Sequence, residues 1–224
     1  MSILLFLTCI AFNSIFSQDW ADLSRYKDAN AIIKADMKKE ARVVFMGNSI
    51  TEVWVSMRPE FFKENPYIGR GISGQTTPQM LVRFRQDVID LNPAVVVLLA
   101  GTNDIAGNTG PLTLEEILDN IRSMAELAEA NGIKVVLCSV LPAFDYPWRP
   151  GLKPNEKIPA LNALIKIFAE SKGFVYLDYF SAMADERNGL PKEYAEDEVH
   201  PTEAGYKVME PLVKSAIQTV LNSQ

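Results

Sequence analysis

Four continuous apolar runs constrain the fold of this chain more than any other feature of its sequence. They cover residues 43–46, 94–100, 133–141 and 174–177, and they are rich in Val and Leu. Unbroken apolar runs are typical of strands that are covered on both faces, whereas half-exposed strands alternate apolar and polar residues. Tyr67-Ile68, between Pro66 and Gly69, is a weaker fifth candidate strand. The sequence therefore predicts a sheet with two buried faces.

Helical patterns separate these runs. Apolar residues recur at spacings of three and four within residues 80–91, 114–125, 158–168 and 208–220. Thr113 and Glu116 have the form of a capping box, and Pro211 is a candidate kink in the last helix. A further helix is expected from Trp20 to about Lys39. The alternation predicts an α/β fold with three layers, a doubly wound, parallel, five-stranded sheet with helices on both faces.

Composition excludes several classes of partner. The chain has 224 residues, of which 48% are apolar and 22% charged, and its net charge is −6. An acidic protein is poorly suited to nucleic acid or to an anionic membrane as its main partner. The size and the absence of any long linker indicate a single domain over residues 18–224.

The first residues form a separate segment. Residues 1–17 are apolar and contain no charged side chain, which predicts a cleaved signal peptide and export to the periplasm or the extracellular space. Phe6, Leu7 and Thr8 precede Cys9 without the small residues expected before a lipidated cysteine. Once the segment is removed, Cys138 is the one cysteine left, and it is expected to be a small core residue.

The chain contains one histidine, His200, three residues after Asp197. A serine nucleophile needs a base, and a neutral imidazole is the usual one near neutral pH. Ser49 directly follows the run at residues 43–46 and Gly47-Asn48, and the carboxyl ends of parallel strands gather at one edge of the sheet. Residues 101–104 and 142–150 fall at the same edge. The sequence thus predicts a catalytic site there.

Four segments carry a resemblance to a known family. Gly47-Asn48-Ser49-Ile50-Thr51, Gly71-Ile72-Ser73-Gly74, Gly101-Thr102-Asn103-Asp104 and Asp197-Glu198-Val199-His200-Pro201 resemble, in order, the four sequence blocks of the SGNH (GDSL-type) hydrolases. The resemblance spans about residues 42–215. It implies a flavodoxin-like α/β fold and the hydrolysis of carboxylic esters without a metal or cofactor.

The resemblance also implies roles for particular residues. Ser49 would be the nucleophile, His200 the base and Asp197 the group that orients the imidazole. The backbone N–H groups of Ser49 and Gly74 and the side-chain amide of Asn103 would form the oxyanion hole. The family usually has Asp before the serine, where this chain has Asn48. Asn keeps an acceptor oxygen, so activity is expected to survive this departure.

Several alternatives stay open at this point. Glu198 competes with Asp197 as the partner of His200. Gly69, Gly71 and Gly74 form a literal G-x-G-x-x-G, but no acidic residue ends a following strand about 20 residues later, as a nicotinamide-dependent oxidoreductase would require. A non-catalytic, glycan-binding protein of the same fold is the other alternative. One histidine and one mature cysteine predict no metal site.

The expected substrate is a small acyl ester, in particular an acetyl ester, of a carbohydrate or a lysophospholipid-like alcohol. Aromatic and polar residues near the predicted site are candidates for a rim that holds this substrate. These residues are Trp54, Tyr146, Trp148 and Arg149. The predicted partner is therefore a small-molecule or glycan ester.

Overall fold

The computed structural model describes residues 19–36 and 41–223 and contains a five-stranded parallel sheet. Its strands are β1 (Val43–Gly47), β2 (Tyr67–Gly71), β3 (Val95–Leu99), β4 (Lys134–Cys138) and β5 (Val175–Leu177). They lie in the order β2-β1-β3-β4-β5, and every pair is parallel. The chain runs outward from β1 to β2 and then crosses back to β3, so the winding direction reverses beside β1. The predicted doubly wound sheet is confirmed.

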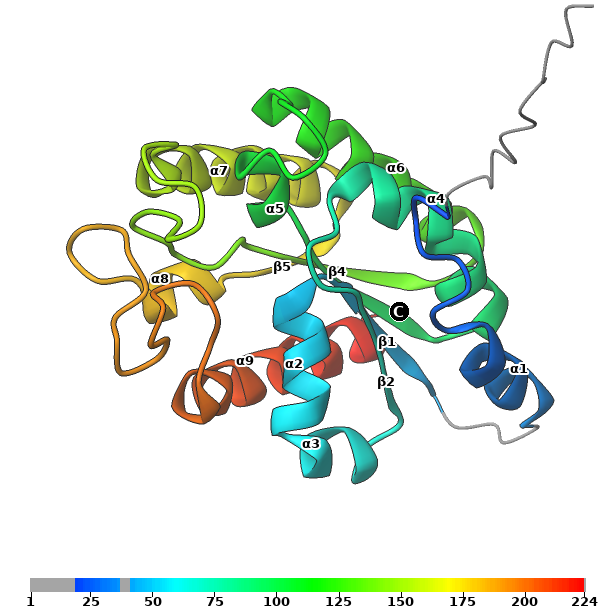
Figure 1. Cartoon of the computed structure of the whole chain (residues 1–224). Coiled ribbons are helices and arrows are strands. Elements are labelled where there is room, and N and C mark those ends of the chain that lie inside the picture. Colours follow the sequence, from blue (N-terminus) through cyan, green and yellow to red (C-terminus); the bar gives the residue numbers. More distant parts are fainter. Residues whose placement is uncertain (1–18, 37–40, 224) are drawn as a thin grey trace, which may run out of the picture.

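Helices cover both faces of the sheet (Figure 1). One face carries α4 (Thr77–Asp87), α6 (Leu114–Ala130) and α7 (Pro154–Lys172), and the other carries α2 (Ser49–Met57), α3 (Pro59–Lys63) and α9 (Glu203–Asn222). Successive residues of a strand alternate between the two cores, with Val44 of β1 in the first and Phe45 in the second. The unbroken apolar runs therefore arise because both faces are buried.

The structure differs from the predicted helices at two places. The helix predicted from Trp20 to about Lys39 is wrong in its start, because α1 covers Lys27–Ala35; Lys39 itself lies outside the described residues. The Asp19 side chain accepts hydrogen bonds from the N–H groups of Leu23 and Ser24. These bonds hold the residues before α1 in turns. The pattern over 80–91 is divided between α4 and the 3-10 helix η1 (Ile89–Leu91).

Short helices and the last helix complete the fold. α5 (Thr102–Ile105) and α8 (Tyr179–Met183) follow β3 and β5, and Pro211 lies inside α9. Cys138 is buried on β4, as expected. The predicted signal peptide, residues 1–17, and Cys9 lie outside the described residues. Within residues 19–36 and 41–223 we find no helix with the length and apolar character needed to span a bilayer.

Candidate active site

Ser49 lies at the sharp turn between β1 and α2. It is the first residue of α2 and is 9% exposed. Asn48 caps this helix, because its side-chain oxygen accepts the N–H of Ile50 at 3.1 Å. The acceptor oxygen that Asn shares with Asp is thus used to hold the turn.

Glycines let α2 pack directly on β2. A Cβ at Gly71 would lie 2.2 Å from the backbone nitrogen of Glu52, and one at Gly69 would lie 2.2 Å from the Val55 side chain. Two glycines of the G-x-G-x-x-G are therefore required by close packing. The third, Gly74, has φ +77, in the left-handed region that favours glycine.

Folding brings Ser49 and His200 together from opposite ends of the chain. The Ser49 Oγ lies 3.0 Å from His200 Nε2. The other ring nitrogen, His200 Nδ1, lies 2.7 Å from Asp197 Oδ2. Both distances are within hydrogen-bonding range, and together they form a continuous path from a hydroxyl through an imidazole to a carboxylate.

A tight turn fixes the Asp197 carboxylate. Its Oδ1 accepts the backbone N–H groups of Val199 at 3.0 Å and of His200 at 2.7 Å. Partial burial raises the pKa of this carboxyl, but the hydrogen bonds from the His200 backbone, the His200 ring and the Val199 backbone outweigh it. The pKa of Asp197 therefore lies below its ordinary value, which keeps the group ionised beside the imidazole.

Glu198 has a different partner. Its Oε1 lies 3.4 Å from the guanidinium of Arg187, while its backbone has φ +61. The left-handed conformation at this position allows the chain to turn back, so that Asp197 and not Glu198 contacts the ring.

Two candidate oxyanion donors lie near each other, Gly74 in the loop after β2 and Asn103 in α5, after β3. The Asn103 side-chain amide is buried and donates one hydrogen bond to the Gln75 carbonyl at 3.0 Å. An amide NH2 has two hydrogens, and the second has no acceptor among the described residues, so it can donate to a substrate oxygen. The Gly74 carbonyl accepts from the Asn108 side chain at 3.0 Å. The peptides around Gly74 are thus held from two sides.

Asp104, next to Asn103, was not assigned a role from the sequence. It is 2% exposed, and its Oδ1 accepts from Thr77 through the backbone N–H at 2.8 Å and the hydroxyl at 2.6 Å. Among the described residues its Oδ2 has no hydrogen-bond partner. Burial raises the pKa of Asp104 to about 6, although the Thr77 hydrogen bonds oppose the shift. This carboxylate anchors the start of α4 to α5.

The rim role predicted for Trp54 and Tyr146 is wrong, because both side chains are buried. Trp54 is 1% exposed and stacks between Phe61 and Tyr206, at centroid distances of 5.2 and 5.3 Å. Tyr146 is 0% exposed, and its hydroxyl lies 2.8 Å from the Thr102 hydroxyl. Both side chains fill the core, so neither can contact a substrate.

Trp148 and Arg149 are exposed. Trp148 is 47% exposed, stacks on Tyr146, and lies 5.9 Å from the His200 ring between centroids. Arg149 donates to the carbonyls of Ala106 at 2.7 Å and Gly107 at 2.8 Å. The structure therefore puts Trp148 beside the imidazole, and uses Arg149 to tie its loop to α5.

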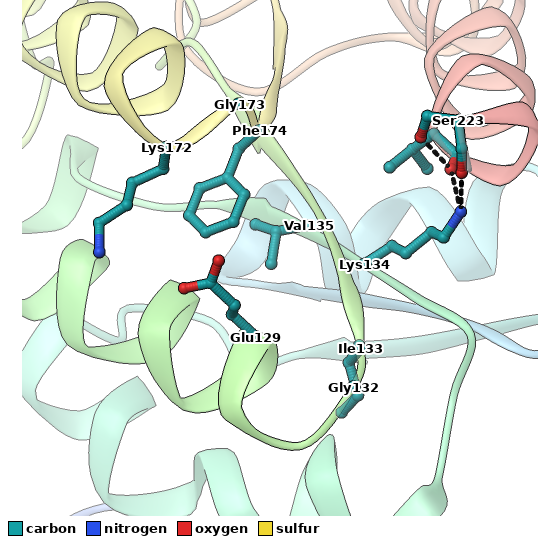
Figure 2. A pocket seen from close by; sticks show the side chains of 10 residues that line it. Glu129, Gly132, Ile133, Lys134, Val135, Lys172, Gly173, Phe174 and Ser223 are labelled. Carbon is teal, nitrogen blue, oxygen red and sulfur yellow. Dashed lines mark hydrogen bonds between the residues drawn. The ribbon is translucent and has the colours of Figure 1, made fainter.

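A groove of about 560 Å³ begins at His200 and includes Val53 and Met57 of α2. A second hollow, of about 310 Å³, is lined by residues at the start of β4 and β5, where Lys134 points toward the end of α9 (Figure 2). Since the strands are parallel, this hollow lies at the edge of the sheet opposite to Ser49. The groove at His200 is the one that belongs to the candidate site.

Comparisons with known proteins identify the family of this chain. Residues 45–208 match the model of the GDSL-like Lipase/Acylhydrolase family. A crystal structure from Bacteroides fragilis is 51% identical, with a TM-score of 0.88 over 92% of this chain and 100% of that one. The structure of a GDSL-like lipase from Bacteroides thetaiotaomicron is 52% identical, with a TM-score of 0.86 over 89% of this chain and 98% of that one.

An acetylxylan esterase from Xylanibacter ruminicola is 26% identical over 83% of this chain. The match covers 45% of that enzyme, so this chain spans about half the length of its curated relative. The chain belongs to the GDSL-like lipase/acylhydrolase family. Its matched segment is a carboxylic ester hydrolase domain, as the four sequence blocks predict.

Proposed function

We propose that the protein hydrolyses carboxylic esters with Ser49 as nucleophile, His200 as general base and Asp197 as the group that orients the imidazole. The 3.0 Å contact between Ser49 and His200 is the observation that carries this proposal. His200 takes the serine proton as Ser49 attacks the carbonyl carbon, and it returns the proton to the departing alcohol. Water then releases the acyl group from Ser49 by the same route.

The oxyanion of the tetrahedral intermediate would be bound by three donors. The N–H of Ser49 lies in the first turn of a helix, where backbone N–H groups have no intrahelical acceptor. The N–H of Gly74 and the second amide hydrogen of Asn103 complete the set. Fixed donors of this kind stabilise developing negative charge without a reorganisation cost during the reaction.

Replacement of the nucleophile tests the mechanism. Ser49→Ala should reduce kcat for p-nitrophenyl acetate by at least about 10⁴-fold, because no hydroxyl remains to form the acyl-enzyme. Ser56→Ala, on the same helix, is the matched control and should be unchanged. Near-normal turnover by Ser49→Ala would refute the mechanism. Absence of turnover in the wild type with retained glycan affinity would indicate the glycan-binding alternative.

The substrate we propose is an acetyl or short-acyl ester of a carbohydrate. His200 must protonate the departing alcohol, so the alcohol lies beside this ring and beside the exposed face of Trp148. An aromatic face suits the C–H face of a sugar ring. The described residues of the adjoining groove include three carboxylates, from Glu196, Asp197 and Glu203, and no Lys or Arg. This charge disfavours the phosphate of a lysophospholipid.

The substrate proposal is tested with two alcohols. Trp148→Ala should raise KM for acetylated xylobiose about 2- to 12-fold, since aromatic contacts contribute roughly 0.5–1.5 kcal/mol, and should leave the hydrolysis of ethyl acetate unchanged. A parallel assay on lysophosphatidylcholine should show slower turnover than on the acetylated sugar. Preference for the phospholipid would contradict the proposed substrate class.

We also infer that the protein is exported. The apolar, uncharged character of residues 1–17 supports this inference. Mass spectrometry of the protein isolated from its native cells should give a chain that lacks this segment, and an intact N-terminus would contradict the inference.

A further inference from the structure

The segment at residues 19–36, which we call the N-terminal strap, precedes the part of the chain that matches the family model. Figure 1 shows it in blue beside α4, with α1 at the edge of the molecule. Some of its contacts reach the segment Gly71–Gln75, which we call the oxyanion loop because it contains Gly74. Three independent connections join the two segments.

The first connection passes through Gln75. Its side-chain amide donates to the Ala21 carbonyl of the strap at 2.7 Å, and its side-chain oxygen accepts from Arg83 at 2.6 Å. The Gln75 backbone carbonyl accepts the amide of Asn103. A single buried residue, next to Gly74, therefore links the strap to a proposed oxyanion donor.

Arg83 extends this connection to the nucleophile. It is fully buried on α4, and it donates to the Gly47 carbonyl at 2.9 Å, two residues before Ser49. It also forms an ion pair with Asp87 at 3.0 Å. Because buried charged groups are stable only when their hydrogen bonds are made, this guanidinium fixes the distance between the nucleophile turn and the oxyanion loop.

The second and third connections flank Gly74 on its other side. The Tyr26 hydroxyl of the strap donates to the Gly71 carbonyl. Arg25 pairs with Glu52 of α2 at 2.6 Å, and Glu52 in turn accepts the backbone N–H of Ser73 at 2.8 Å. The peptide that carries the Gly74 N–H begins at Ser73, so this chain of contacts orients a proposed donor.

We propose that the N-terminal strap is a positioning element for the oxyanion hole, acting through Ala21, Arg25 and Tyr26. Gly74 lacks a side chain to restrict its backbone, so the loop depends on external contacts for a fixed geometry. Donors stabilise an oxyanion only when they are held in place before the reaction, and a displacement of about 1 Å can reduce a rate about 100-fold. This inference rests on the proposed function.

The strap also has attachments away from the loop, and these supply a matched control. Gln86 on α4 donates through its side-chain amide to the Leu23 carbonyl at 2.7 Å. Gln75 and Gln86 therefore make the same type of bond to the same segment, but only the bond from Gln75 begins in the oxyanion loop. Because the Gln75 side chain also accepts from Arg83, the closest match to Gln86→Met is Tyr26→Phe, since each removes one side-chain hydrogen bond between the strap and the rest of the chain. A purely structural role of the strap predicts similar effects on activity for these two variants.

The test compares Gln75→Met and Tyr26→Phe with Gln86→Met in the full chain. With p-nitrophenyl acetate, the first two variants should lower kcat about 10-fold and change KM less than about 2-fold. Their affinity for phenylboronic acid, a tetrahedral transition-state analogue, should fall by a similar factor. Gln86→Met should keep wild-type kcat and affinity. The pH profile of kcat/KM should be the same in all variants, because the contacts above do not involve His200.

Tyr26→Phe removes one hydroxyl and keeps the ring, so this variant is expected to fold and a loss of its activity can be attributed to the missing hydrogen bond. The proposal is overturned if Tyr26→Phe and Gln75→Met retain wild-type kcat and boronate affinity, or if Gln86→Met loses as much as they do. If the wild type hydrolyses no ester, the proposed function fails and this inference with it. If the wild type hydrolyses the ester and the strap variants have the same kcat as the wild type, the proposed function stands and only the role of the strap is contradicted.

Discussion

Two carboxylates, Asp197 and Asp104, contact or adjoin different groups of the candidate site, His200 and Asn103, and their environments differ. Asp197 belongs to a short turn with an exposed side chain, and hydrogen bonds to its ionised form lower its pKa. Asp104 is buried under the oxyanion side, and burial raises its pKa to about 6. The pKa of Asp197 is lowered, so this group stays charged, whereas Asp104 takes up a proton as the pH falls through about 6.

This difference matches the two tasks of an ester hydrolase. On the side proposed to move protons, His200 and its orienting group Asp197 are three residues apart, and Ser49 is the one long-range partner. The oxyanion side depends on long-range contacts such as Arg83 with Gly47 and Asp104 with Thr77. Proton transfer needs a partner of the correct charge, whereas charge stabilisation needs fixed dipoles.

The largest effect is expected on the proton-transfer side. His200→Gln should lower kcat/KM by at least about 10⁴-fold, because glutamine cannot accept the serine proton. In the wild type, kcat/KM should increase as the pH is raised from about 5 to 8, because only a deprotonated imidazole can accept the serine proton. Initial rates on p-nitrophenyl acetate across this range measure both effects. A flat wild-type profile would count against His200 as the base.

Replacement of Asp197 should have the next largest effect. Asp197→Asn should reduce kcat about 10³ to 10⁴-fold, because the amide no longer stabilises the tautomer and charge of the ring that catalysis requires. Glu198→Gln is the matched control, since Glu198 contacts Arg187 and not the imidazole. Its kcat should stay within about 3-fold of the wild type. Equal losses in the two variants would show that the orienting group has been assigned to the wrong carboxylate.

On the oxyanion side, Asn103→Ala should lower kcat about 100-fold with little change in KM, because one donor to the tetrahedral intermediate is lost. Steady-state kinetics on a short-chain ester measure this split. Asn131→Ala, at an exposed helix end where the amide donates to Leu127, should leave the kinetics unchanged. A rise in KM at constant kcat would instead assign Asn103 to ground-state binding.

The raised pKa of Asp104 predicts a smaller effect, on the free energy of unfolding. Its pKa is about 6 in the folded protein and about 3.8 in the unfolded chain, so the folded state retains a proton that the unfolded state releases. Its contribution therefore falls as pH rises from about 4 to 6, by on the order of 3 kcal/mol in the free energy of unfolding.

Asp104→Asn keeps an oxygen for Thr77 and cannot ionise. Between pH 4.5 and 7.5, wild-type protein should lose about 2–3 kcal/mol more unfolding free energy than this variant. Urea unfolding at the two pH values gives the difference. Asp119→Asn, exposed on α6, should follow the wild type. Parallel behaviour of wild type and Asp104→Asn would contradict the raised pKa.

The contrast between the two sides also explains what could be predicted from the sequence. The strands were visible because burial on both faces leaves unbroken apolar runs. The turn around Asp197 was visible because its contacts are local. Arg83 was not, since its partners Gly47 and Gln75 are brought to it by the packing of α4 against β1 and the loop after β2. No spacing in the sequence encodes such contacts.

The aromatic residues show the same principle. Trp54 and Trp148 are both close in sequence to segments of the site, and their side chains have the same chemistry. Trp54 faces the core because it lies on the inner side of α2, against Phe61 and Tyr206. Trp148 lies in a loop and stacks on the buried Tyr146 with its other side exposed. Burial of a single aromatic ring is decided by tertiary packing, which residue type does not reveal.

The smallest effect is expected at Asn48, where the sequence departs from the family pattern. Asn48→Asp keeps the acceptor for the Ile50 N–H, and a negative charge at a helix N-terminus is favourable by about 0.3–1 kcal/mol. Burial of that charge opposes this gain. We therefore expect kcat to stay within about 3-fold of the wild type and the thermal midpoint to move by only a few degrees. A much larger change in kcat would mean that residue 48 contributes to the reaction itself, and that the division between a local proton-transfer side and a long-range oxyanion side leaves out a group next to the nucleophile.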